Sequence, residues 1–158
     1  MEKAKIQGGI DMEELKFSIN ISATREKVWE TLWNDSTFRD WASIIDEGTY
    51  LEGDLVEGGD VQFISSVNGY GVTSLIEKLV PYEFILFRHR SDTMDSGQQS
   101  RERQWTGGKE SYSLIEIDGF TKLTLRSDVP LELLEVFNLL LPQALERIKA
   151  LSEGIVRK

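Results

Sequence analysis

The sequence predicts a single α+β domain in the order strand, two short helices, strand meander and long helix. Three observations support this class. Leu15 to Ile21 alternates apolar and polar residues with the period of two that a strand with one buried face requires. Asn68-Gly69 and Asp118-Gly119 each separate two strand-like runs, and both dipeptides are typical of tight hairpin turns. Residues 131–153 repeat apolar side chains at helical spacing.

The first elements follow from capping signals. Residues 1 to about 12 contain Gly8-Gly9 and are expected to form a flexible tail, with the domain over residues 13–158. After the first strand, Thr24 can cap a helix over residues 25–33. Asn34-Asp35 ends this helix, and a second short helix is expected to run through Trp41.

The middle of the chain is predicted to be a meander that ends at a long helix. The candidate strands are residues 48–53, 60–67, 70–80, 83–90, 111–117 and 120–127. Residues 91–104 contain Met94 as their one apolar residue and are predicted to be a loop. Pro130 is expected to open the final helix, and Pro142 to kink it.

Turn lengths predict which side chains face inward. A two-residue turn at Asn68-Gly69 would place Phe63 opposite Ser74, and one at Pro81-Tyr82 would place Ser74 opposite His89. The resulting inner face is apolar except at Ser65, Ser74 and His89. Small polar side chains on an inner face leave space and hydrogen-bonding groups, as a ligand site needs. The alternative is that the strands fray there and these side chains meet water.

Composition excludes several classes of function. The chain has 158 residues, a net charge of −9 and no cysteine. An acidic surface disfavours nucleic acids and anionic membranes as partners. One histidine and no cysteine make a zinc site improbable, so neither a metal nor a cofactor is expected. The sequence has no apolar run of membrane-spanning length and no signal peptide pattern, so a cytoplasmic location is expected.

An ordered set of motifs resembles the START-like or helix-grip (SRPBCC) superfamily. These motifs are ISATREKVWETLWND with Trp41 following, VNGYG, LIEKLVPYEFILF, GFTKLTL and ALERIKALSE. Within the superfamily, the sequence looks most like the activators of heat-shock-protein ATPase homologues, although Phe120 interrupts the usual turn motif. The resemblance implies a curved antiparallel sheet of about six or seven strands around the C-terminal helix. It also implies a hydrophobic cavity between sheet and helix, with the second short helix at its entrance.

Binding of a small hydrophobic molecule in this cavity, without catalysis, is the favoured hypothesis. Phe38 and Trp41 are expected at the entrance, whereas Val28, Trp29 and Leu32 are expected in the core. The predicted ligand-binding residues are Phe38, Trp41, Phe63, Tyr70, Ser74, Phe87, His89, Trp105, Tyr112, Phe137 and Leu141.

Two alternatives stay open. In the first, the chain is an enzyme of the cyclase or dehydratase type in which His89 transfers protons. In the second, it is a protein-interaction module, such as a chaperone regulator, and a homodimer is compatible with either.

Arg101, Arg103 and Lys109 surround Trp105 and could meet an anionic ligand head at the cavity mouth. The acidic residues between Asp46 and Asp60 are expected to form a solvated rim.

Overall fold

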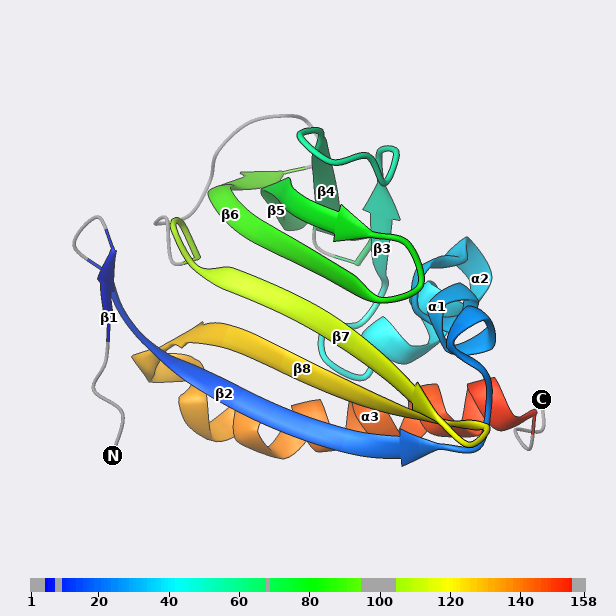
Figure 1. The fold of residues 1–158 in the computed structure, drawn as a ribbon. Coiled ribbons are helices and arrows are strands. Elements are labelled where there is room, and N and C mark those ends of the chain that lie inside the picture. Colours follow the sequence, from blue (N-terminus) through cyan, green and yellow to red (C-terminus); the bar gives the residue numbers. More distant parts are fainter. Residues whose placement is uncertain (1–4, 8–9, 68, 95–104, 155–158) are drawn as a thin grey trace.

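One curved antiparallel sheet wraps around the C-terminal helix, as the helix-grip prediction requires (Figure 1). The computed structural model describes residues 5–7, 10–67, 69–94 and 105–154. Within these residues the sheet has eight strands in the order β1-β2-β8-β7-β6-β5-β4-β3. The strands are β1 Lys5–Gln7, β2 Ile10–Ile21, β3 Thr49–Glu52, β4 Asp60–Ser65, β5 Tyr70–Val80, β6 Phe84–Met94, β7 Lys109–Ile117 and β8 Phe120–Pro130.

The helices also lie where the sequence predicts them. They are α1 Arg25–Trp33, α2 Asp35–Ala42, the 3-10 turn η1 Leu131–Leu133 and α3 Leu134–Glu153. Thr24 caps α1, since its hydroxyl accepts a hydrogen bond from the Lys27 N–H at 3.2 Å. The sequence predicts the final helix from Leu131, whereas α3 begins at Leu134 and the 3-10 turn η1 precedes it. Among the described residues, no helix is both long enough and apolar enough to cross a membrane.

The predicted ends of two strands are wrong. The tail was expected to reach residue 12, but β2 begins at Ile10 and Lys5–Gln7 pairs with it as β1. Met12 pairs with Pro130 and is fully buried. This burial stabilises the strand beyond the alternating segment Leu15–Ile21. Likewise β6 continues to Met94 through the predicted loop, because residues 91–94 pair with β5; residues 95–104 of that loop lie outside the described residues.

The hairpin between β4 and β5 is longer than two residues. Phe63 pairs with Val72, not with Ser74, because the last described pair is Ile64 with Gly71 and the turn takes up the residues between them. The shift is an even number of residues, so each side chain keeps its predicted face. A Cβ atom at Gly71 would lie 2.1 Å from the Phe63 carbonyl oxygen, so the two strands can approach this closely only with glycine there.

The next two hairpins confirm their predicted pairs. Ser74 pairs with His89, although the β5–β6 turn contains three residues rather than two. A bulge at Glu77 compensates for the extra residue. At Asp118-Gly119 both residues have positive φ, 52° and 83°, as a type I′ turn requires.

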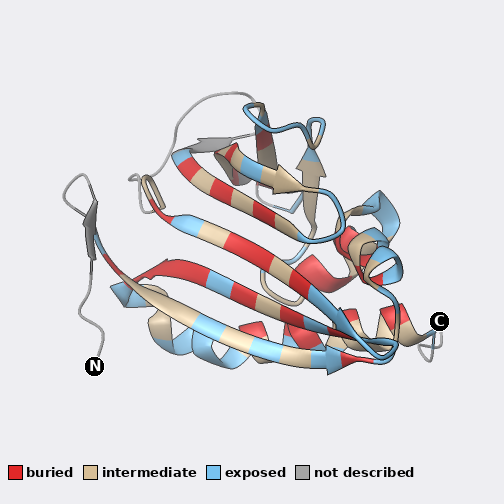
Figure 2. Ribbon diagram, viewed as in Figure 1, coloured by how far each residue is buried: buried red, intermediate tan, exposed pale blue. Residues whose placement is uncertain are grey.

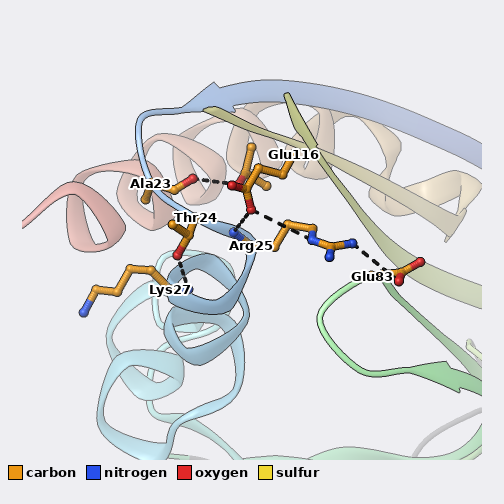
Figure 3. Close-up of polar contacts among 7 residues, drawn as sticks. Ala23, Thr24, Arg25, Lys27, Glu83 and Glu116 are labelled. Atoms are coloured by element: carbon orange, nitrogen blue, oxygen red, sulfur yellow. Dashed lines mark hydrogen bonds and ion pairs between the residues drawn. The ribbon is translucent and has the colours of Figure 1, made fainter. Parts of the chain in front are cut away.

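Polar contacts at one end of the molecule attach the start of helix α1 to the sheet (Figure 3). Glu116 of β7 accepts a hydrogen bond from the Arg25 N–H at 3.0 Å, and Glu83 lies 3.4 Å from the Arg25 guanidinium. The Thr121 hydroxyl donates to the Ala23 carbonyl at 2.7 Å. These contacts fix the start of α1 against the turns of two hairpins.

The core lies between the concave face of the sheet and the three helices. Buried residues alternate along the central strands and gather on the inward sides of the helices (Figure 2). Val28 and Leu32 of α1 are fully buried, as predicted, and Trp29 is partly buried against Tyr82. Leu141, Leu145 and Ile148 bury the same side of α3. A bidentate pair between Arg147 and Asp40, at 2.6 and 2.9 Å, holds α3 against α2.

The C-terminal end of α3 is held by Glu153. Its carboxylate accepts hydrogen bonds from Lys149 at 2.5 Å and from the Ser22 N–H at 2.7 Å. The bond from Lys149 and then the bond from Ser22 lower the pKa of Glu153 below its usual value. A lowered carboxyl pKa stabilises the fold above the unfolded-state pKa, and this stabilisation is lost as pH falls through the folded-state pKa.

We therefore predict that Glu153→Gln lowers the free energy of unfolding by about 1 kcal/mol at pH 7. The difference from wild type should shrink as pH falls below about 4.5, the ordinary carboxyl pKa. Urea unfolding at several pH values measures it. Glu146→Gln, at an exposed position of the same helix, is the matched control, and a loss that does not depend on pH would contradict the prediction.

Candidate functional site: a partly open cavity between sheet and helix

A cavity of about 300 Å³ lies between the concave face of the sheet and helices α2 and α3. The cavity is built by elements that are distant in sequence, because the curved sheet brings its strands close to α2 and α3. The lining residues are Phe38, Trp41, Ala42, Ile45, Asp46, Thr49, Phe63, Ser65, Gly71, Val72, His89, Trp105, Glu110, Tyr112, Ser127, Leu133, Phe137 and Leu141.

Most of the aromatic side chains predicted for the site do line the cavity. Phe38 and Trp41, both nearly fully buried, come from α2. The centroid of the Trp105 ring lies 5.3 Å from that of Phe137 in α3 and 5.9 Å from that of His89 in β6. Phe63, Tyr112 and Leu141 also line the cavity.

Three residues predicted to bind the ligand are not among the lining residues of the cavity. The side chain of Tyr70 lies outside the described part of the chain. Phe87 is fully buried and does not line the cavity; its ring packs 5.2 Å from Phe63 and thus supports the cavity wall from behind. Ser74 is also fully buried and does not line the cavity, and its hydroxyl is hydrogen-bonded to His89.

A chain of polar side chains forms one wall. The Ser74 hydroxyl oxygen lies 2.7 Å from His89 Nδ1, and His89 Nε2 lies 3.4 Å from Glu110 Oε1. The Tyr112 hydroxyl donates a short hydrogen bond to Glu110 Oε2. Ser74 and His89 are buried, whereas the Glu110 side chain keeps 24% of its surface exposed. Glu110 is therefore the member of this chain that a molecule in the cavity can reach most easily.

The backbone holds this polar chain in place. His89 donates its N–H to the Gly108 carbonyl at 2.8 Å, and its own carbonyl accepts from the Gly107 N–H at 2.7 Å. Tyr112 lies two residues after Glu110 in β7, so both side chains point to the same face.

Sequence reasoning missed Glu110 and Ser127 as cavity residues. The predicted strand began at residue 111, one position after Glu110. Extending the alternation outward from Tyr112 and Leu125 by one step would have placed both residues on the inner face. The predicted strand 120–127 already contains Ser127, so only Glu110 lies beyond a predicted strand. The polar character of both residues concealed their place on the cavity wall.

Burial, and next the neighbouring Glu110, raise the pKa of the Tyr112 hydroxyl well above its ordinary value. The phenol consequently stays protonated and remains a donor to Glu110. Groups of three or more His, Asp or Glu side chains suited to hold a metal ion do not occur among the described residues.

In an ultraviolet titration of the tyrosines, we predict that the Tyr112 hydroxyl ionises well above the ordinary tyrosine pKa of 10.0. Tyr112→Phe should then remove the component that titrates at the highest pH and leave the others unchanged. Tyr82→Phe, at an exposed turn, is the matched control and should leave that component in place. An unchanged high-pH component in Tyr112→Phe would contradict this assignment.

Comparison with known proteins agrees with the fold. The solution structure of the Aha1 dimer from Colwellia psychrerythraea has a TM-score of 0.70 at 18% identity, over 92% of this chain and all (100%) of that one. CV1439 from Chromobacterium violaceum has a TM-score of 0.64 at 20% identity, over 89% of this chain and 96% of that one. CalU16 from Micromonospora echinospora has a TM-score of 0.64 at 16% identity, over 98% of this chain and 83% of that one.

Among curated protein sequences, none matches the chain. The family model described as "Activator of Hsp90 ATPase homolog 1-like protein" matches residues 22–153, from the end of β2 to the end of α3. The chain therefore belongs to the family of activator of Hsp90 ATPase homolog 1-like proteins.

Proposed function

We propose that the chain binds a small, mainly apolar molecule in the cavity between sheet and α3, without changing it chemically. The observation that carries this proposal is an aromatic cavity of about 300 Å³ with a few polar groups on one wall. Binding sites for small molecules typically have this size and this distribution of apolar and polar groups. The aromatic rings would supply the affinity, and Glu110 with its neighbours would orient the ligand.

Acid–base catalysis in the same cavity is a second candidate, favoured by the chain Ser74–His89–Glu110–Tyr112. His89 was expected to be the proton-transferring group, but its Nδ1 is engaged by Ser74 and its Nε2 points to Glu110. Glu110 would thus exchange the proton with the substrate, and His89 would support it. This candidate requires that a bound molecule is altered, which mass spectrometry of the recovered ligand would detect.

The protein-interaction alternative has weaker support. It would use exposed apolar side chains, and Ile115, Ile117 and Phe120 lie together at the β7–β8 hairpin. No feature of this hairpin indicates a particular partner. The Colwellia Aha1 structure is that of a dimer, and a homodimer of the present chain remains a prediction based on that likeness.

Ligand binding predicts that the neutral dye N-phenyl-1-naphthylamine enters the cavity and quenches tryptophan fluorescence. Trp41 and Trp105 line the cavity and would report this binding. Val72→Phe, which adds bulk to the lining, should weaken dye binding by about tenfold or more, since it fills space that the ligand needs.

Ile115→Phe is the matched control, because it also replaces a β-branched residue by phenylalanine, at an exposed site on the same sheet. It should leave dye affinity unchanged. Equal affinity in the two variants, or no dye binding to the wild type, would contradict the proposed function.

A further inference from the structure

The described lining of the cavity has an excess of negative charge. Asp46 and Glu110 are its carboxyl side chains, and neither Lys nor Arg occurs among the described lining residues. His89 is the one basic side chain there.

We infer that the cavity selects apolar ligands by the charge of their polar end, preferring an ammonium group to a carboxylate. This inference rests on the proposed function and specifies the class of ligand as organic amines with an apolar, aromatic-sized body. A carboxylate placed beside Glu110 would be repelled. An ammonium group would be attracted to Glu110 and could donate a hydrogen bond to it.

Glu110 has acceptor capacity left for such a ligand. Its Oε2 accepts from the Tyr112 hydroxyl, whereas among the described residues its Oε1 has one neighbour, His89 Nε2 at 3.4 Å. Charge-assisted hydrogen bonds between nitrogen and a carboxylate are shorter, at about 2.7 to 2.9 Å. Each carboxylate oxygen can also accept more than one hydrogen bond. The partly exposed Oε1 side of Glu110 therefore suits a donor supplied by a ligand.

The aromatic walls favour the same class of ligand. Trp105 lies beside His89 and Phe137, and Tyr112 lies beside Glu110. A cation over an aromatic face gains electrostatic attraction that increases when water is excluded, whereas an anion gains none. The carboxylate and the rings would thus act together on one ammonium group.

The basic side chains of the described sheet lie elsewhere. Lys16, Lys122 and Arg126 line a shallow hollow on the strands that is separate from the cavity. Lys109, expected near an anionic ligand head, is exposed and does not line the cavity; its N–H donates to Asp128 at 2.9 Å. These three basic side chains and Lys109 therefore do not line the cavity in which Glu110 lies.

Three probes with the same aromatic body test the inference: 2-naphthylethylamine, 2-naphthylethanol and 2-naphthylacetate. Their affinities are measured by displacement of N-phenyl-1-naphthylamine at pH 7 and low ionic strength. The amine should bind at least about tenfold more tightly than the acetate, with the alcohol between them. Added salt should reduce the difference, because screening weakens the charge interactions.

Glu110→Gln should remove most of the preference for the amine over the acetate, because it removes a negative charge from the cavity wall. Glu146→Gln, an exposed carboxylate outside the cavity, should keep the preference. Thermal unfolding of each variant checks that it is folded. Because the wild-type comparison needs no variant, a poorly folded Glu110→Gln would not prevent the test.

Two results would overturn the inference and leave the proposed function standing. One is binding of the three probes with equal affinity. The other is tighter binding of the acetate than of the amine. If none of the probes nor the dye binds, the proposed function itself fails.

Discussion

Tyr112 connects the apolar core of this domain with the polar wall of its cavity. Its ring lies 5.0 Å from Trp33 of α1 and 6.2 Å from Trp41 of α2, so it determines how closely the helices approach the sheet. Its hydroxyl donates to Glu110, which in turn contacts His89. Burying the phenol makes its ionisation unfavourable, so the donor to Glu110 persists. The position of one side chain thereby couples helix packing to the chemistry of the site.

The cavity exists because packing is incomplete in one region of the interface between sheet and helix. Toward the C-terminal end of α3, Leu145 and Ile148 are buried and the space is filled. Toward its N-terminal end, Phe137 and Leu133 line the cavity instead. Large rings there meet small residues such as Gly71, Ser65 and Ser127 on the sheet. Small side chains cannot fill the space left by a curved sheet, so a partly open cavity remains.

Much of the fold could be predicted because its signals are local. The cap at Thr24, the type I′ turn at Asp118-Gly119 and the alternation in Leu15–Ile21 each depend on neighbouring residues alone. The ends of the strands and the register between β4 and β5 were harder to predict from the sequence. Met12 joins β2 because Pro130 lies opposite it, and the Phe63–Val72 pairing needs the close approach that Gly71 permits. Those contacts join residues far apart in sequence or depend on exact turn length.

The sequence by itself determined the order of elements, the inward faces of the strands and most aromatic residues of the cavity, because side-chain periodicity reflects burial directly. Only the tertiary structure decided how the polar residues are used. It placed the Ser74 hydroxyl on His89 rather than in the cavity, and it brought Glu110 to the cavity wall. These outcomes depend on distances between different strands and on the curvature of the whole sheet, which local patterns do not specify.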